Sequence, residues 1–403
     1  MKALVYLINH QLQNMKNIIR RIELTHVHVP FKEAVRKAMG EGEGGLGMAI
    51  GAEEAWLGGD SVIIKLITDD GIEGMGEVFV WLPESGVSPN QIIDSIKNGL
   101  SNYVLGENPF DIEKINHRMD LNISRNDIAK GLIDMACYDL MGNLSNLPAC
   151  NFMGGKNIDR IPLAALIPLG SPMLMKGITR SYYKRGFRTI RLKLGNGIQN
   201  DVEICKIIRD TFGDKIRLRI DYNQAYTPPE AIKAIKSIEC FNIDYAEQPV
   251  SIDDYMGMKY VQERVDTPLM AHEGYFSLKD FISLVELSAV EVLGINSERP
   301  GGITKALKAM NYAESRGLGI VLHNQPLGIA SAMQLHLHAA KAFSINHASE
   351  LFGDEMMEDD LIKKPIDYSG GFAKLPEGTG WGVELDEIAL NKYKKSPTQV
   401  IER

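Results

Sequence analysis

Three acidic residues follow short apolar stretches at a regular spacing. Asp221 ends "IRLRID", Glu247 ends "IDYAE" and Glu273 follows "PLMAH", and the two intervals between them are equal. One acidic residue at the end of a strand is more often a helix cap or a turn former. Three that converge would repel one another strongly unless a cation lay between them. Oxygen ligands of this kind suit Mg²⁺, whereas zinc calls for histidine or cysteine, so the pattern predicts a magnesium site.

Two basic residues lie on either side of these carboxylates in the sequence. Lys193 ends "TIRLK", one predicted strand before the carboxylates, and His323 follows "GIVL", two predicted strands after them. In a closed arrangement of strands they would flank the α-carbon of a metal-bound carboxylate substrate. The metal would stabilise the enediolate that forms when the α-proton leaves. Arg191 precedes Lys193 on the same strand face, and its charge would favour the neutral, basic form of the lysine.

Further polar residues occur where the other predicted strands end. Asn223 and His272 each lie close to one of the carboxylates in sequence, and we expect them to contact the substrate or a metal ligand. The apolar run "AVEVLGI" ends in Asn296 and three more polar residues before a Pro-Gly-Gly turn, which is more than a strand that only fills a core requires. Within this group we expect Glu298 and Arg299 to form an ion pair in the turn rather than a substrate contact.

The elements that must position these residues alternate regularly between about residue 160 and residue 365. The strand-like stretches are "IPLAALIPL", "TIRLKL", "IRLRIDYN", "IDYAEQP", "PLMAHEG", "VEVLGIN", "GIVLHNQ" and "INHASEL", and helical patterns separate them. Eight units of such even size predict an α/β fold with a (β/α)8-type barrel over residues 156–365, rather than a doubly wound open sheet. The carboxyl ends of barrel strands converge on one mouth, which would bring these polar residues together.

The regions on either side of the predicted barrel have other patterns. Residues 17–155 contain long alternating stretches followed by helical ones, which predicts an α+β capping domain. The tail, residues 366–403, is expected to pack back on that domain. Residues 1–16 contain only a short apolar stretch and no cleavage site of a signal peptide, so we expect a flexible extension.

A glycine-rich stretch, "GEGEGGLG", satisfies the GxGxxG pattern of dinucleotide-binding loops. It follows a helical pattern instead of a strand, and its two glutamates would repel a pyrophosphate. We therefore expect a mobile flap near residues 40–55.

The composition excludes several classes of function. The chain has 403 residues, 44% of them hydrophobic, and a net charge of −8, which argues against general binding to nucleic acid or to anionic membranes. Four scattered cysteines without a CxxC pair indicate a reducing compartment. No apolar run reaches the length needed to span a bilayer. We expect a cytoplasmic homo-oligomer that acts on a small-molecule carboxylate.

The barrel motifs resemble those of the enolase superfamily, in its mandelate racemase/muconate-lactonizing branch. The resemblance runs from "GMGE" to "GWGVELDE" and includes "RLKLG", "IDYNQAY", "AEQP", "HEG", "GGITKALKAMNYAE" and "LHNQPLGIASA". It implies that Asp221, Glu247 and Glu273 bind Mg²⁺ and that Lys193 and His323 are the acid/base pair. It also implies that Glu350 hydrogen-bonds the substrate carboxylate or the enediolate, and that the capping domain closes over the substrate and selects it.

The sequence departs from this family pattern at Asn296. Racemases of the branch have an aspartate there, paired with the histidine, and the muconate-lactonizing group has a catalytic lysine. We expect the side-chain carbonyl of Asn296 to accept a hydrogen bond from Nδ1 of His323 and to leave that histidine neutral. This would modestly favour elimination, as in an acid-sugar dehydratase, over symmetric two-base racemisation, and a racemase or a cycloisomerase stays open. A Schiff-base aldolase that uses Lys193, and a non-catalytic relative that binds a metal and a carboxylate, are the alternatives.

Overall fold

The computed structural model describes residues 17–40, 57–324 and 326–402. The extension predicted for residues 1–16 and nearly all of the flap predicted near residues 40–55 lie outside these ranges. No helix in the described ranges is long and apolar enough to cross a membrane. Of the four cysteines, three are buried and Cys240 is exposed.

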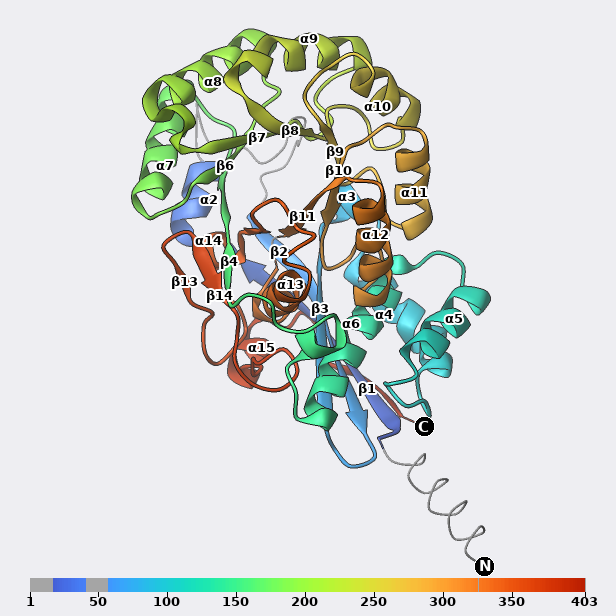
Figure 1. Ribbon diagram of the computed structural model, residues 1–403. Helices are drawn as coiled ribbons and strands as arrows, with labels where there is room; N and C mark the ends of the chain where they lie inside the picture. Colours follow the sequence, from blue (N-terminus) through green and yellow to red (C-terminus); the bar gives the residue numbers. More distant parts are fainter. Residues whose placement is uncertain (1–16, 41–56, 325, 403) are drawn as a thin grey trace, which may run out of the picture.

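Eight parallel strands form a nearly closed barrel, which confirms the predicted fold class (Figure 1). The strands pair in chain order, and a parallel bridge between Leu163 and Ser349 brings the two edges of the sheet together. The strands are β5 (Ala164–Ile167), β6 (Thr189–Lys193), β7 (Arg217–Asp221), β8 (Ile243–Glu247), β9 (Leu269–Ala271), β10 (Val292–Ile295), β11 (Gly319–Asn324) and β12 (Glu350–Leu351).

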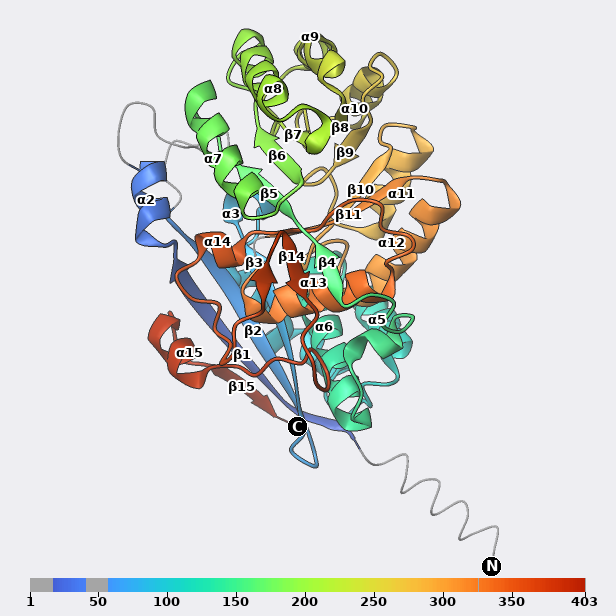
Figure 2. The same cartoon turned by 60° about the vertical axis from the view of Figure 1, so that its left-hand side comes forward.

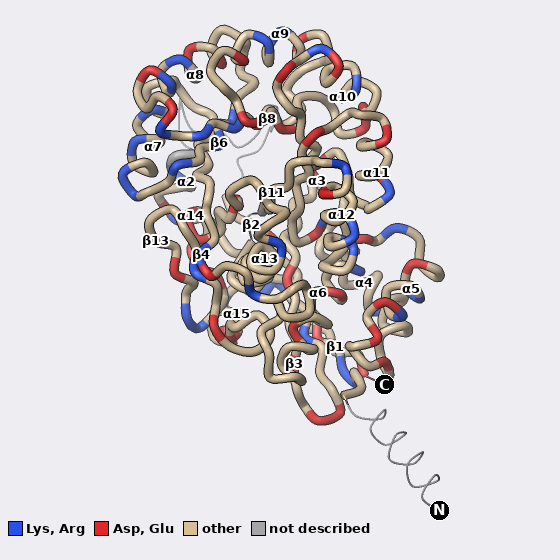
Figure 3. Tube along the Cα trace, in the orientation of Figure 1, with Lys and Arg blue, Asp and Glu red and all other residues tan. Residues whose placement is uncertain are grey.

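Helices follow the strands in alternation and cover the outside of the barrel. Ser171, Thr227 and Ser277 cap three of them, each with an oxygen that faces the free amides of the first turn. Figure 3 shows charged residues of both signs around the outer helices, whereas α13 carries none and is buried along its whole length. The helices are α7 (Pro172–Lys184), α8 (Ile198–Phe212), α9 (Pro228–Ile238), α10 (Tyr255–Gln262), α11 (Leu278–Glu286), α12 (Ile303–Ser315) and α13 (Gly328–Ala340).

An antiparallel sheet and the helices packed on it form the capping domain (Figure 2). The sheet order is β15-β1-β2-β3, so the C-terminal strand β15 pairs with β1 and joins the tail to this domain. Its strands are β1 (Ile19–Pro30), β2 (Gly58–Thr68), β3 (Glu73–Val80) and β15 (Gln399–Glu402), and its helices are α2 (Glu33–Gly40), α3 (Leu82–Ser85), α4 (Pro89–Asn98), α5 (Ile112–Asn122) and α6 (Asp127–Ser145).

Short elements lie before and after the barrel strands in the chain. The strands β4 (Arg160–Pro162), β13 (Tyr368–Ser369) and β14 (Phe372–Lys374) form a small antiparallel sheet. The helices α14 (Gly353–Met356) and α15 (Glu387–Tyr393) precede and follow its last two strands.

Buried carboxylates of the capping domain bind the amino ends of two barrel helices. Asp134 accepts hydrogen bonds from the backbone N–H and the hydroxyl of Thr304 at the start of α12. Gly302 permits this approach, because a Cβ there would lie 2.6 Å from the carboxylate of Asp134. Glu77 accepts the backbone N–H groups of Leu327 and Ala330 at the start of α13. These contacts fix the capping domain against the barrel, since helix amino ends favour negative charge.

Candidate active site

The strand register places the predicted site residues side by side at the mouth of the barrel. Lys193, Asp221 and Glu247 end β6, β7 and β8, and the register pairs Lys193 with Asp221 and Asp221 with Glu247. Glu273 follows the end of β9, and His323 lies near the end of β11. All five residues are buried, and none is more than 4% exposed. The structure therefore brings together the carboxylates and bases that the sequence singles out.

Arg191 lies at the centre of the carboxylates. Its Nη2 lies 2.5 Å from Oδ2 of Asp221 and 2.6 Å from Oε1 of Glu247, and its Nε lies 3.2 Å from Oε2 of Glu350. Burial would raise the pKa of Asp221, but Arg191 and Lys193 outweigh burial and lower it. Arg191 thus contacts the carboxylates directly, in addition to preceding Lys193 on the same strand.

Lys193 and Asn223 meet beside Asp221. Nζ of Lys193 lies 2.5 Å from Oδ2 of Asp221 and also donates to the side-chain oxygen of Asn223. The backbone N–H of Asn223 donates to Oδ1 of Asp221, and its Nδ2 lies 3.3 Å from Oε1 of Glu273. Asn223 therefore links the base candidate to two of the three acidic residues.

Glu273 has excess negative charge around it. Burial and the nearby carboxylates, first Glu84 and then Asp221 and Glu247, raise its pKa to about 7. Its Oε1 accepts a hydrogen bond from Nε2 of Gln224 at 3.3 Å. The sequence reasoning missed Gln224, although its position directly after Asn223 could have suggested it.

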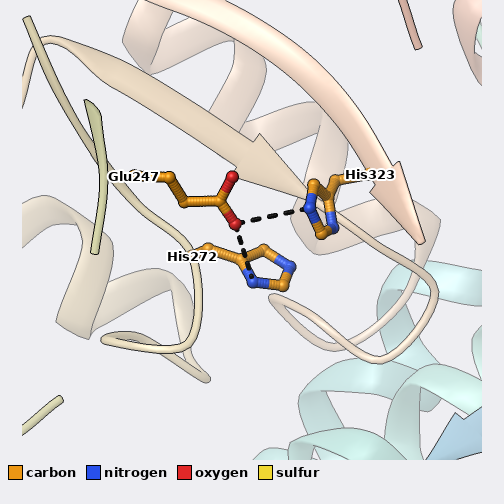
Figure 4. Close-up of side chains that lie close together, drawn as sticks. All are labelled: Glu247, His272 and His323. Carbon is orange, nitrogen blue, oxygen red and sulfur yellow. Dashed lines mark ion pairs between the residues drawn. The ribbon is translucent and has the colours of Figure 1, made fainter. Parts of the chain in front are cut away.

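His272 and His323 approach Glu247 from two directions, as Figure 4 shows. Nδ1 of His272 lies 3.4 Å and Nε2 of His323 lies 3.3 Å from the same oxygen, Oε1 of Glu247. The two imidazole rings are tilted by 49° with their centroids 3.8 Å apart. Ligand atoms of these three residues lie within 4.8 Å of one another, so within the described residues this is the group of side chains close enough together to hold a cation.

Glu350 is surrounded by cationic and hydroxyl groups inside the barrel. Its Oε1 accepts hydrogen bonds from Nη1 of Arg219 at 2.7 Å and from the hydroxyl of Tyr245 at 3.0 Å. Its Oε2 lies 3.0 Å from Nε2 of His323. Burial opposes ionisation, but Arg191 and His323 outweigh it and hold the pKa of Glu350 well below its usual value.

The sequence reasoning missed Arg219 and Tyr245, although the strand period offered a signal for both. Each lies two residues before a predicted metal ligand, Arg219 before Asp221 and Tyr245 before Glu247. Because side chains alternate along a strand, both must point to the same interior as those ligands.

The predicted contact between Asn296 and His323 is wrong. Oδ1 of Asn296 accepts the backbone N–H of Arg299 at 2.7 Å, and Nδ2 donates to Oε1 of Glu298 at 2.7 Å. The histidine nearest to the amide is His272, with Nδ2 and Nε2 separated by 3.5 Å. Within the described ranges, Nδ1 of His323 has no hydrogen-bond partner. The amide is occupied by its own turn, because hydrogen bonds between neighbours in sequence form without further ordering of the chain.

The surroundings of His323 oppose the neutral state expected for it. Burial alone would lower the pKa of His323, but the carboxylates of Glu247 and Glu350 raise it to about 9 despite Arg191. The surrounding carboxylates therefore favour the imidazolium form of His323. The preference for elimination that followed from a neutral histidine loses its basis.

The turn ion pair predicted for Glu298 and Arg299 is long, since Oε1 and Nη2 are 3.7 Å apart. Arg299 has closer partners in Glu84 of the capping domain and in His272. The turn therefore connects the barrel mouth to the capping domain.

The acidic residues at the mouth fit a divalent cation. Asp221, Glu247 and Glu273 offer only oxygen atoms, which suits Mg²⁺. Oxygens of Asp221 and Glu247 already converge on a single nitrogen of Arg191. The raised pKa of Glu273 marks negative charge that a further cation would neutralise.

Two parts of the chain match two related families of domains. Residues 51–154 match the mandelate racemase/muconate lactonizing enzyme N-terminal domain, and residues 175–389 match the enolase C-terminal domain-like family. The N-succinyl-L-Arg/Lys racemase of Bacillus cereus is 30% identical over 334 residues, which are 82% of this chain and 89% of that protein. The hydrophobic dipeptide epimerase of Enterococcus faecalis is 35% identical over 286 residues, or 70% of this chain and 80% of that protein.

A solved structure extends the similarity to the whole fold. The dipeptide epimerase of Enterococcus faecalis, complexed with Mg and the dipeptide L-Leu-L-Tyr, has a TM-score of 0.81 and 30% identity, and the match covers 91% of this chain and 99% of that one. Both domains, their order and the strand-end motifs thus agree with one family. The chain belongs to the mandelate racemase/muconate lactonizing enzyme branch of the enolase superfamily, and it is an enzyme of the racemase, epimerase and cycloisomerase class found there.

Proposed function

We propose that the protein is a Mg²⁺-dependent racemase or epimerase that exchanges the proton α to the carboxylate of a small molecule. The observation that carries this proposal is the placement of Lys193 and His323 around the acidic residues. In the barrel, four strands (β7 to β10) separate β6 from β11 on one side and two (β5 and β12) on the other. The two bases therefore reach the mouth from different sides.

We assign the metal to Asp221, Glu247 and Glu273. These residues give the all-oxygen set that Mg²⁺ prefers, whereas the group formed by Glu247, His272 and His323 includes two imidazoles. A Mg²⁺ ion bound there would supply positive charge to the substrate carboxylate as negative charge develops on it. Support comes from the Mg in the similar dipeptide epimerase structure.

The remaining residues of the mouth orient the reacting groups. Nη1 of Arg191 is buried and has no hydrogen-bond partner in the described ranges, so we assign to it a hydrogen bond to the substrate. Glu350 holds Arg191 and His323 in place through its ion pairs. Lys193 then takes or returns a proton on one face of the α-carbon, and His323 does so on the other.

N-acylated amino acids and dipeptides are the substrate class that we propose first. The similar proteins are named for an N-succinyl amino acid and for hydrophobic dipeptides. Asn296 occupies the position of the catalytic lysine in the muconate-lactonizing group, and an amide cannot transfer that proton. His323 must therefore supply the second acid/base group in this chain, if both faces are to exchange.

Dehydration of an acid sugar is a second candidate, favoured by one observation. The carboxylates of Glu247 and Glu350 raise the pKa of His323 to about 9, so an imidazolium is available at neutral pH. Such a group could protonate a leaving hydroxyl after Lys193 has removed the α-proton.

The test is a substrate screen in D₂O with Mg²⁺ present. N-acyl amino acids, dipeptides and acid sugars are incubated with the enzyme, α-proton loss is followed by ¹H NMR, and products are separated by chirality. We expect deuterium to enter both enantiomers of an N-acyl amino acid or a dipeptide without loss of water. Formation of a 2-keto acid would instead identify the dehydratase, and binding of substrates without exchange would contradict both reactions.

Two variants separate the roles of the bases. Lys193→Met should lower the rate of exchange from one enantiomer by about 10²–10⁴-fold, and His323→Asn should lower the rate from the other enantiomer by a similar factor. The control is Lys206→Met, which removes an exposed lysine on α8 that pairs with Asp210. Normal racemisation by either active-site variant would move the chemistry to another residue.

A further inference from the structure

Arg299 joins the capping domain to the barrel mouth through one nitrogen atom. Its side chain is fully buried, and Nη2 lies 2.6 Å from Oε1 of Glu84 on α3 and 2.8 Å from Nε2 of His272. The guanidinium lies over the ring of Phe276, with its carbon 4.9 Å from the ring centroid. In the described ranges, Nε and Nη1 have no hydrogen-bond partner. Within the described residues, the polar contacts of this guanidinium are therefore made by Nη2.

The contact with Arg299 determines which nitrogen of His272 carries the proton. A guanidinium can only donate hydrogen bonds, so Nε2 of His272 must accept. The contacts of Asn296 lead to the same assignment. Its Oδ1 accepts a backbone N–H and its Nδ2 donates to Glu298, so the atom of Asn296 that faces Nε2 of His272 is the donor Nδ2. Two donors thus face Nε2, and the single N–H group of the ring lies on Nδ1.

The N–H group of His272 faces the acidic residues of the mouth. Nδ1 lies 3.2 Å from Oε2 of Glu273 and 3.4 Å from Oε1 of Glu247. Figure 4 shows this edge of the ring turned toward Glu247. A series of contacts therefore runs from Glu84 of the capping domain through Arg299 and His272 to two residues that the proposed function assigns to the metal.

We propose that Arg299 is a positioning residue that fixes His272 in the tautomer whose Nδ1–H group orients the metal-binding carboxylates, with Glu84 of the capping domain as its anchor. The proposal rests on the proposed function, because it takes Glu247 and Glu273 as ligands. Hydrogen bonds to metal ligands affect affinity strongly, and their loss typically weakens metal binding about 10–100-fold. Docking of α3 at the barrel mouth and metal binding would then favour each other.

Simple electrostatics predicts the opposite effect of removing Arg299. The loss of a buried positive charge near the carboxylates should tighten the binding of a divalent cation. A purely structural contact between barrel and cap should change stability and leave the histidine tautomer as it is. The sign of the change in metal affinity and the tautomer of His272 therefore separate these explanations.

The experiment uses the full chain and two readouts that do not depend on turnover. Long-range ¹H–¹⁵N NMR of the metal-free protein with labelled histidine reports the tautomer of His272, and its signals are assigned by their loss in His272→Asn. Calorimetric titration with Mn²⁺ reports metal affinity. For Arg299→Met we expect the Nδ1–H form to lose its dominance and Mn²⁺ affinity to fall about 10–100-fold. Arg299→Lys, which still donates to Nε2, should stay closer to the parent in both readouts.

Two further variants complete the design. Arg316→Met removes an exposed arginine that directly follows α12 and pairs with Glu286, and it should change neither readout. If Arg299→Met does not fold, Glu84→Ala tests the same contact from the partly exposed side, and we expect a mixed tautomer and weaker Mn²⁺ binding.

An unchanged tautomer, or Mn²⁺ binding that is unchanged or tighter in the Arg299 or Glu84 variant, would overturn the inference. Glu273→Gln shows whether the proposed function fails instead. If that variant binds Mn²⁺ like the parent, the metal assignment itself is wrong. If it binds weakly while Arg299→Met binds normally, only the role of Arg299 is wrong.

Discussion

Nε2 of His323 lies 3.0 Å from Oε2 of Glu350, its register partner on the neighbouring barrel strand. The same carboxylate binds Arg219 and contacts Arg191, so it is held from three sides within the barrel. A carboxylate fixed in this way favours the imidazolium form of His323 and holds the ring in one orientation. The charged partner of the histidine thus comes from the sheet and not from a loop.

Glu350→Gln should therefore impair the enzyme far more than Asn296→Ala. Glutamine keeps the shape of the side chain but removes one of the two charges, those of Glu247 and Glu350, that stabilise the imidazolium, so we expect the pKa of His323 to fall in the metal-free protein. Turnover should fall by about 10²-fold or more, as for loss of a positioned acid or base. NMR titration of His323 and steady-state kinetics give the two values.

Asn296→Ala is the matched comparison for this prediction. It should leave the pKa of His323 unchanged, because the amide contacts Glu298 and the backbone of Arg299 instead. Equal titration curves for Glu350→Gln and the parent enzyme would refute the pairing. Thermal unfolding of each variant checks that the fold is retained, since breaking a buried ion pair costs about 3–5 kcal/mol.

Metal affinity should depend on pH through Glu273. Burial and neighbouring carboxylates raise its pKa to about 7, so below that pH a proton competes with the metal. Mn²⁺ affinity measured by calorimetry should rise between pH 5 and pH 8, and this slope should largely vanish in Glu273→Gln. A chelator should abolish turnover and added Mg²⁺ should restore it. Full activity after exhaustive chelation would contradict the metal assignment.

Acid should destabilise the fold through His336 on α13. Its Nδ1 accepts the backbone N–H of Cys150 at 3.2 Å and its Nε2 lies 3.1 Å from the carbonyl oxygen of Trp381, an arrangement that requires the neutral ring. Burial lowers its pKa to about 4, below the value of about 6.5 in an unfolded chain. Between these values the unfolded chain binds the additional proton, so stability falls as the pH decreases from about 6.5 to about 4.

The measurement is urea unfolding of the parent and of His336→Gln across this range. Glutamine can donate and accept in similar directions but does not titrate. We expect its free energy of unfolding to depend less on pH, by up to about 1.4 kcal/mol per pH unit. Identical slopes in the two proteins would exclude His336 as a source of the acid sensitivity.

Trp381 should contribute strongly to the attachment of the C-terminal tail. Its ring is fully buried, and Nε1 donates to the carbonyl oxygen of Met75 in the capping sheet at 2.9 Å. We expect Trp381→Ala to lower the free energy of unfolding by about 3–5 kcal/mol. Trp381→Phe keeps much of the packing and should lose less, about 1–3 kcal/mol for the unpaired carbonyl. Equal losses in urea unfolding would show that the hydrogen bond contributes more than the packing.

The sequence alone determined the fold class and which acidic and basic residues lie at the mouth of the barrel. Alternation of apolar strands and helices is a local property, and parallel strands must end at the same edge. Lys193, Asp221, Glu247 and His323 could therefore be placed from their positions at strand ends. Arg219 and Tyr245 were within reach of the same reasoning, because the strand period points them inward.

Only the tertiary structure decided which of these side chains contact one another. Asn296 lies at the strand end where related racemases have the partner of the histidine. Here its side chain binds the backbone N–H of Arg299 in its own turn, and the carboxylate near His323 is that of Glu350. The closest carboxylate partner of Arg299 is Glu84, which is remote in sequence and lies on the capping domain. Such contacts depend on the turn geometry and on the packing of one domain against another, and neither is encoded in the period or the spacing of a single segment.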